Sequence, residues 1–164
     1  MKINISGLST GFHTFEVSQS AQTMDLPGNF LGDVTVRVSL EKTSWQILAT
    51  IRATVNASFQ CDRCADDFTA PIDVTFDAVY SWDETDRSAA EDENFFILAE
   101  GQNAIDLTDV VREYLVLAVP AKTLCREECR GLCPVCGTNL NEHTCDCRPG
   151  EHDGRWDALQ KLVS

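Results

Sequence analysis

The chain has 164 residues and a formal net charge of −13, enough for one domain or for one domain with an appendage. Such an acidic surface repels phosphate backbones, which disfavours nucleic-acid binding over a large area. No stretch reaches the roughly 18 apolar residues of a membrane span, and the N-terminal sequence lacks an apolar signal-peptide core, so we expect a cytoplasmic protein.

Residues 2–40 predict β-structure interrupted by turns. The Lys2–Ile5 segment alternates polar and apolar side chains, and Pro27–Asn29 is typical of a turn. A clearer half-buried strand follows, in which every second side chain is apolar, at Val34, Val36, Val38 and Leu40.

The clearest pattern is an apolar–polar alternation that begins at residue 45, stops at two cysteines and resumes at residue 70. Its apolar row is Trp45, Ile47, Ala49, Ile51, Ala53, Val55, Ala57 and Phe59, then Ala70, Ile72, Val74, Phe76, Ala78 and Tyr80. The first strand would be about 50 Å long if straight, so we expect a bend or a bulge in it. Cys61 and Cys64 would lie at the tip of this antiparallel hairpin, where packing gives no reason for cysteine.

Three further segments follow the hairpin. Residues 83–93 carry six acidic residues against one arginine and predict a solvated loop, and the apolar run Phe95–Leu98 predicts a short strand. Residues 107–118 predict an amphipathic helix that Asp106 would cap and that ends before Pro120. A last short helix near the C-terminus would turn inward the apolar side chains of Trp156, Leu159, Leu162 and Val163.

Eight cysteines occur as four close pairs, Cys61/Cys64, Cys125/Cys129, Cys133/Cys136 and Cys145/Cys147. Paired thiolates on tight turns are what tetrahedral Zn²⁺ requires, and two sites of four sulfurs would use every cysteine. Eight thiolates with two Zn²⁺ would bring the net charge to about −17. Disulfides suit oxidising compartments, and a thioredoxin-like C-x-x-C precedes a helix rather than a strand, so zinc is the favoured interpretation.

Three partitions of the sulfurs are open. The favoured one makes site one from the first two pairs and site two from the last two, because only eight residues separate Cys136 from Cys145 and Gly131 breaks the chain between the groups. A second groups the two middle pairs and sends Cys145/Cys147 to the hairpin, and a third binds one zinc and leaves four thiols free. In the favoured partition, losing Cys145 should loosen only the local tail.

Basic residues stand beside the cysteines of both predicted sites, at Arg63, Arg126, Arg130 and Arg148. We expect these arginines to offset the negative charge of the zinc–thiolate centres, with direct RNA contact as the alternative. His143 lies two residues before Cys145 and is an alternative ligand that a four-sulfur site does not need.

The order of these motifs resembles the YceD family, named for large ribosomal RNA subunit accumulation. The resemblance rests on the hairpin C-x-x-C, the helix before a proline, the C-x-x-x-C, the Gly131–Asn141 segment with its C-P-V-C-G turn, the C-x-C and a C-terminal D-G-R-W. It covers the chain from about Cys61 onward and includes all eight cysteines. It implies a bacterial cytoplasmic protein that supports the synthesis, processing or stability of large-subunit (23S) rRNA.

The predicted fold class is α+β, an antiparallel, barrel-like or strongly twisted β-sheet with one packing helix and a zinc-stapled C-terminal region. We expect residues 1–120 to form a β-rich domain with the hairpin tip at 61–64, and residues 121–164 to form a cysteine-rich zinc-binding segment with a short helix packed on it.

The sequence indicates a protein that is not an enzyme, since four-sulfur sites leave zinc no open position and no hydrolase or nucleotide-binding motif occurs. The first hypothesis is a ribosome-biogenesis factor with structural zinc. The second is an acidic chaperone or adaptor for a basic ribosomal protein, and a third, from another class, is a thiol-redox protein. The charge favours a basic ribosomal or assembly protein as partner over direct contact with rRNA.

Overall fold

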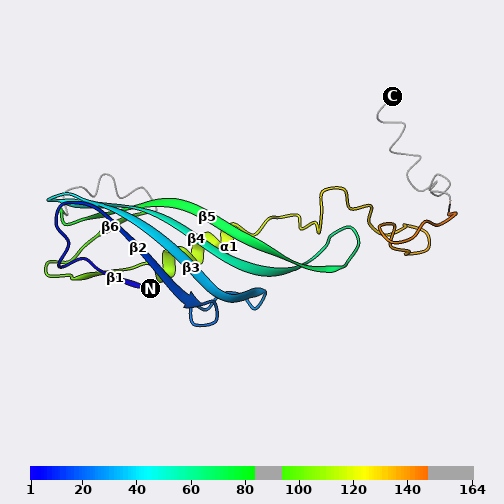
Figure 1. Cartoon of the computed structure of the whole chain (residues 1–164), viewed down its shortest axis with the longest axis horizontal. Coiled ribbons are helices and arrows are strands. Elements are labelled where there is room, and N and C mark those ends of the chain that lie inside the picture. Colours follow the sequence, from blue (N-terminus) through cyan, green and yellow to red (C-terminus); the bar gives the residue numbers. More distant parts are fainter. Residues whose placement is uncertain (84–93, 148–164) are drawn as a thin grey trace, which may run out of the picture. The chain divides into compact units, whose positions relative to one another are not determined.

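The structure, a computed structural model, describes residues 1–83 and 94–147, and within them seven strands and one helix occur (Figure 1). The strands are β1 (Lys2–Asn4), β2 (Gly11–Ser20), β3 (Phe30–Lys42), β4 (Gln46–Gln60), β5 (Asp67–Ser81), β6 (Phe95–Ile97) and β7 (Ala104–Asp106), and helix α1 is Thr108–Leu117. The predicted C-terminal helix, Arg148 and residues 84–93 of the predicted acidic loop lie outside the described residues.

The chain divides into two compact units. One, the sheet unit, contains Met1–Phe59 and Thr69–Ala121, and the other, the cysteine unit, contains Gln60–Phe68 and the chain from Lys122 on. The tip of the β4–β5 hairpin therefore groups with the cysteine-rich segment, although its two strands belong mainly to the sheet unit. No helix within the described ranges has the length and apolar character that a membrane span needs.

The main sheet has the strand order β2-β3-β4-β5-β6. Strands β2, β3 and β4 pair antiparallel in a register that places Val38 beside Ile51 and Leu40 beside Ala49, so the alternating apolar side chains share one face. This face is the core, and most of its side chains are fully buried. The β3–β4 register shifts between Leu31 and Thr35, while β4 advances only from Asn56 to Thr54, so the extra residues lie on β3 and not on the long strand in which a bulge was expected.

Three expectations about this sheet were wrong. Strand β6 pairs parallel with β5, so the sheet is mixed, and the order of its strands is open rather than barrel-like and closed. Alternation reports which face a side chain occupies but not strand direction, and residues 82–94 between β5 and β6 are long enough for a parallel connection. Trp45 is also 58% exposed instead of buried, because β4 begins one residue later.

Helix α1 closes the core over β5, close to its predicted range of 107–118. Val110, Val111 and Leu115 are buried, and the ring of Tyr114 stacks on that of Phe76 with centroids 3.9 Å apart. An amphipathic helix of this kind gains its stability from packing its apolar face on the sheet.

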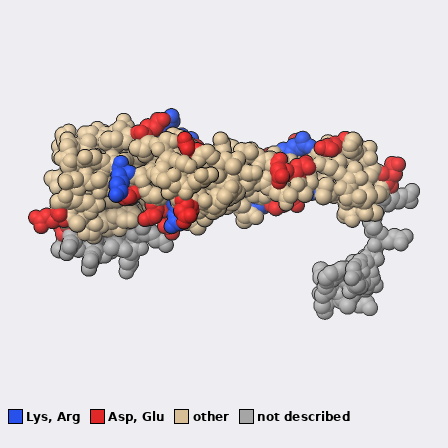
Figure 2. All heavy atoms as spheres, turned by 90° about the horizontal axis from the view of Figure 1, so that it is seen from below, with Lys and Arg blue, Asp and Glu red and all other residues tan. Residues whose placement is uncertain are grey.

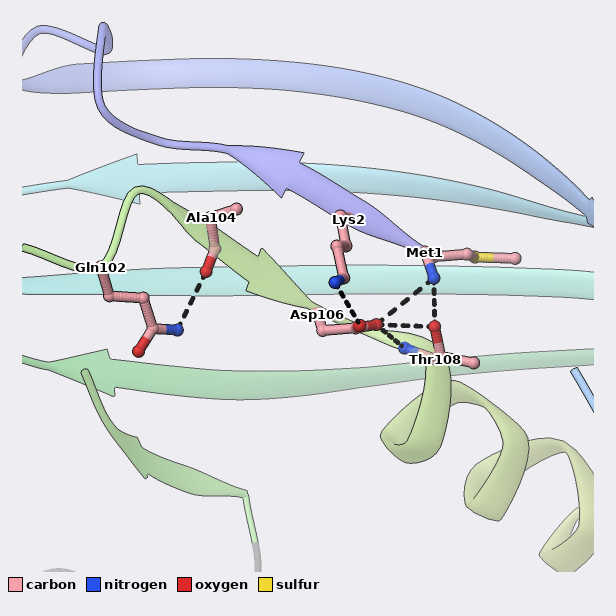
Figure 3. Close-up of polar contacts among 6 residues, drawn as sticks. All are labelled: Met1, Lys2, Gln102, Ala104, Asp106 and Thr108. Atoms are coloured by element: carbon pink, nitrogen blue, oxygen red, sulfur yellow. Dashed lines mark hydrogen bonds and ion pairs between the residues drawn. The ribbon is translucent and has the colours of Figure 1, made fainter. Parts of the chain in front are cut away.

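A second, two-stranded sheet of β1 and β7 leads into this helix. Asp106, at the end of β7, accepts hydrogen bonds from the backbone N–H (3.0 Å) and the hydroxyl (2.6 Å) of Thr108, and it also contacts the amino group of Met1 (Figure 3). Burial opposes ionisation of Asp106, but the hydrogen bonds from Thr108 outweigh it and hold the pKa of Asp106 below its ordinary value. The predicted N-cap was therefore one residue early: Leu107 is the N-cap and makes no side-chain cap bond, and Asp106 satisfies the N–H of the first helical residue from the position before it.

Candidate metal centres

The tip of the β4–β5 hairpin is a tight turn that carries Cys61 and Cys64. The N–H of Cys61 donates to the carbonyl of Asp66 (2.9 Å), and the N–H of Ala65 donates to the carbonyl of Cys61 (2.9 Å). Ala65 adopts a left-handed φ of 60°, which is unusual for a residue with a Cβ and reverses the chain directly after the second cysteine. Both thiols of the turn are buried.

The chain from Lys122 on is attached to this tip at Thr123. The N–H of Asp62 donates to the carbonyl of Thr123 (2.9 Å), while the N–H of Thr123 donates to Asp62 Oδ2 (2.7 Å) and its hydroxyl to the carbonyl of Gln60 (2.8 Å). These three bonds hold the chain two residues before Cys125. They explain how cysteines some sixty positions apart in the sequence meet.

Cys61, Cys64, Cys125 and Cys129 form the first cluster, with all four sulfurs within 4.8 Å of one another. Two of the separations are 3.8 Å, from Cys61 Sγ to Cys129 Sγ, and 3.7 Å, from Cys64 Sγ to Cys125 Sγ. A regular tetrahedron with Zn–S bonds of about 2.3 Å has sulfurs about 3.8 Å apart. A disulfide would require about 2.05 Å, so the residues present fit a metal ion and not a pair of disulfides.

The second cluster is local and contains Cys133, Cys136, Cys145 and Cys147, again with the four sulfurs within 4.8 Å of one another. The Cys133–Cys136 turn is closed by the N–H of Gly137, which donates to the carbonyl of Cys133 (2.9 Å), and by the N–H of Cys133, which donates to the carbonyl of Thr138 (2.8 Å). Gly137 has a φ of +75°, a conformation that favours glycine. Cys136 is exposed, so this cluster is more open to solvent than the first.

The electrostatics of both clusters call for a cation. A backbone hydrogen bond from Cys125 is the largest of the effects that lower the pKa of Cys61 to about 6, and the Thr138 hydroxyl is the largest of those that lower the pKa of Cys136 to about 6. By contrast, burial raises the pKa of Cys125, and the neighbouring Cys136 raises the pKa of Cys147 to about 12. Four thiolates this close repel one another, so full ionisation requires a bound positive charge.

Arg63 contacts backbone carbonyls beside the first cluster. Its Nη1 donates to the backbone carbonyls of Glu127 (3.1 Å) and Cys129 (2.9 Å), so it fastens the hairpin tip to the C-x-x-x-C turn instead of lying on a sulfur. The carbonyl of Arg63 also accepts the N–H of Leu132 (2.9 Å), directly after Gly131. Arg126 and Arg130 are exposed and make no ion pair with any described residue.

The structure thus brings together the same two groups of four thiols as the favoured partition. Binding of metal by these groups stays a prediction. His143 is exposed and belongs to neither group. Sequence reasoning missed Asn141, whose side chain contacts Cys129 Sγ, and Asn139, whose side chain contacts Asn141 and Asp66. The available signal was the presence of two amides in a loop bounded by cysteine pairs.

The open face of the main sheet is a second place where charged groups gather. Arg37 and Arg52 are direct neighbours on β3 and β4 and line, with Thr35 and Thr54, a hollow of about 220 Å³. Each guanidinium is already engaged by a carboxylate, Arg37 by Glu16 (2.9 Å) and Arg52 by Asp73 (2.6 Å). Figure 2 likewise shows basic and acidic side chains next to one another on the face in view. These neutralised pairs form a solvated sheet face rather than an anion site.

The fold and the two clusters define a class of protein, a β-sheet protein that carries two candidate four-thiol metal centres. The chain belongs to the YceD family, described as large ribosomal RNA subunit accumulation protein YceD, which it matches over residues 49–163. The match includes most of the β4–β5 hairpin, helix α1 and all eight cysteines.

Relatives occur in mycobacteria and in plants. An uncharacterized protein of Mycobacterium tuberculosis is 28% identical over 133 residues, 80% of this chain and 61% of the relative, so the chain spans less than two thirds of the length of that relative. Large ribosomal RNA subunit accumulation protein YCED homolog 1, chloroplastic, of Arabidopsis thaliana is 34% identical over 58 residues, 35% of this chain and 18% of the relative. The Zea mays protein of the same name is 35% identical over 51 residues, 30% of this chain and 17% of the relative. No solved structure matches the chain.

Proposed function

We propose that this chain is a non-enzymatic bacterial factor that supports the synthesis, processing or stability of 23S rRNA, and that two structural zinc ions stabilise it in the cytoplasm. The observation that carries the proposal is the pair of closed four-thiol clusters within a chain of the YceD family. The family description and the names of the plant relatives supply the link to large-subunit rRNA.

Zinc suits the donor set better than other biological divalent ions. Four soft thiolates select zinc or iron–sulfur chemistry over magnesium or calcium, and sulfur separations of 3.7 and 3.8 Å match a single tetrahedral ion. Cys61, Cys64, Cys125 and Cys129 would hold one zinc, and the other four cysteines the second. Bound zinc would supply cross-links between distant chain segments and no catalysis, because four protein ligands leave no position for substrate.

A basic protein of the large subunit or of its assembly machinery is the partner that the charge favours. The net charge of −13 attracts cationic surfaces over long range and repels naked RNA. The region around residues 83–93 carries six of the acidic residues against one arginine and is the part of the sequence with the densest negative charge. An electrostatic complex of this kind weakens as salt is raised, since rim charges set the association rate.

The metal content tests the first half of this proposal. Purified chain should contain two zinc ions per molecule and no thiol that reacts before denaturation or chelation. One zinc per chain with four freely reactive thiols would contradict the two-centre arrangement.

In a strain that lacks the gene, Cys61→Ser should restore 23S rRNA less well than wild type, with 16S rRNA as the internal reference. Full restoration of 23S rRNA by this variant would show that the first centre is dispensable for function.

Affinity capture tests the proposed basic protein partner. Replacing six acidic residues by the corresponding amides should lower recovery of the partner while leaving zinc content and melting temperature unchanged; these are Asp83, Glu84, Asp86, Glu91, Asp92 and Glu93. A control variant changes the same net charge at six exposed acids elsewhere, namely Asp33, Glu41, Asp67, Glu100, Glu113 and Glu142. Equal recovery with both variants would reject a specific role of this region. Submicromolar binding of a 23S rRNA fragment at physiological salt would overturn the protein-partner proposal.

A further inference from the structure

Asn141 connects the two thiol clusters. It belongs to the loop between Cys136 and Cys145 that closes the second cluster, but its Nδ2 donates to Cys129 Sγ of the first cluster at 3.3 Å. Its Oδ1 accepts the N–H of Arg130 at 2.9 Å, directly after Cys129. One amide of the second cluster's loop therefore holds both the sulfur and the adjoining backbone of a first-cluster residue.

Asn139 fixes the position of this amide. Its Oδ1 accepts from the backbone N–H (3.0 Å) and from Nδ2 (2.9 Å) of Asn141, and its own Nδ2 donates to Asp66 Oδ2 (3.0 Å) on the hairpin tip. The N–H of Leu140 between the two asparagines donates to the carbonyl of Gly131 (2.9 Å). Asn141 is thus held in one orientation by a loop whose two ends are cysteines of the second cluster.

We infer that metal in the second cluster strengthens metal binding at the first, and that Asn141 is the positioning residue through which it does so. The inference rests on the proposed zinc sites and revises the expectation that losing Cys145 loosens only the local tail. Cys133, Cys136, Cys145 and Cys147 would hold the second metal, and their ligation would close the loop between them and reduce its conformational freedom. The ordered loop would keep Asn141 Nδ2 on Cys129 Sγ, and this hydrogen bond would stabilise the charged, metal-binding form of the ligand.

The second cluster is more exposed than the first and should therefore lose its metal first. Three of the four first-cluster cysteines are buried, whereas Cys136 is exposed and Cys145 and Cys147 are half-buried. Competing ligands therefore reach the second cluster first. Loss of its metal would release the Asn141 loop and lower the zinc affinity of the first cluster, and linkage requires the same factor in the opposite direction.

The experiment titrates the full-length chain with Zn²⁺ in a competing chelator and reads each cluster by residue-resolved protection of its thiols from alkylation, measured by mass spectrometry. Three variants are compared with wild type: Asn141→Ala, the pair Cys145→Ser with Cys147→Ser, and their combination. We expect the first two to weaken zinc protection of Cys61, Cys64, Cys125 and Cys129 by about 10- to 100-fold, as outer hydrogen-bond partners of metal ligands do. The combined variant should lose no more zinc affinity at the first cluster than either change alone, because both changes remove the same Asn141–Cys129 hydrogen bond.

Two further variants keep the result interpretable. Asn141→Asp retains an acceptor for the N–H of Arg130 but replaces the donor to Cys129 Sγ by a carboxylate that repels the thiolate, so it should show at least the loss of Asn141→Ala even if the alanine variant folds poorly. Thr144→Ala, an exposed change in the same loop, should leave both clusters at wild-type affinity.

Three outcomes would overturn the inference. First-cluster affinity within twofold of wild type in the Cys145/Cys147 variant would show independent centres while leaving two zinc sites in place. Losses that multiply in the combined variant would remove Asn141 as the link. Absence of zinc protection at both clusters of the wild-type chain would overturn the proposed zinc sites and the coupling with them.

Discussion

Replacing Gly131 by alanine should weaken the attachment of the hairpin tip to the cysteine-rich segment. A Cβ at this position would lie 2.8 Å from the carbonyl oxygen of Arg63 and 3.2 Å from its Cβ, and Gly131 has a φ of +76°. The left-handed backbone costs an alanine about 1–2 kcal/mol. Displacing Arg63 would in addition weaken its bond from the Leu132 N–H (2.9 Å), worth about 0.5–1.5 kcal/mol. With the steric contact included, we expect a loss of about 2–4 kcal/mol.

Gly137→Ala is the matched control for this change. Gly137 has nearly the same φ, +75°, but nothing lies within 4 Å of an added Cβ, so only the backbone cost of about 1–2 kcal/mol applies. Urea denaturation followed by alkylation of Cys61 and Cys64 measures the opening of the hairpin tip in each variant. If Gly131→Ala opens no more readily than Gly137→Ala, the close approach of Gly131 to Arg63 does not stabilise the cysteine unit, and the argument fails.

Three predictions concern the sheet unit. The Tyr80 hydroxyl is buried without a partner among the described residues, and burial raises its pKa to about 12. Because the phenol of the unfolded chain ionises near pH 10, the free energy of unfolding of the wild type should fall by roughly 2–3 kcal/mol between pH 10 and pH 12. Urea denaturation across that range should show no such loss for Tyr80→Phe. The hydrogen bond from Arg52 lowers the pKa of Asp73. The pair therefore stabilises the fold above the ordinary carboxyl pKa, and this stabilisation is lost as the pH falls through the lowered pKa. The melting temperature of Asp73→Asn should fall less steeply with acid than that of the wild type, and an equal slope would contradict the pairing. Phe76→Ala removes the ring that stacks on Tyr114 and should cost about 3–5 kcal/mol in denaturation experiments, whereas a loss below about 1 kcal/mol would mean that helix α1 does not depend on this contact.

Local patterns in the sequence were sufficient for the long strand β4 and for the helix, but they did not reveal the short strand β7. The alternation from Ile47 to Phe59 predicted a long strand with one buried face, and the 3.6-residue spacing from Leu107 to Ala118 predicted helix α1, because burial of one face imposes those periods directly. The direction of the strands and the closure of the sheet produce no periodic pattern in the sequence. The parallel pairing of β6 with β5 depends on how the chain returns to the sheet, which alternation does not encode.

The sequence by itself determined which residues can be metal ligands, since closely spaced cysteine pairs on turns have few other uses in a chain of this kind. Spacing also favoured the local second cluster, because closing a short loop costs little conformational entropy. Only the tertiary structure decided how Cys125 and Cys129 reach the hairpin tip, through Thr123 and Arg63. It alone placed Asn141 on the sulfur of Cys129, since a hydrogen bond between separate turns depends on their packing and on no local preference of either segment.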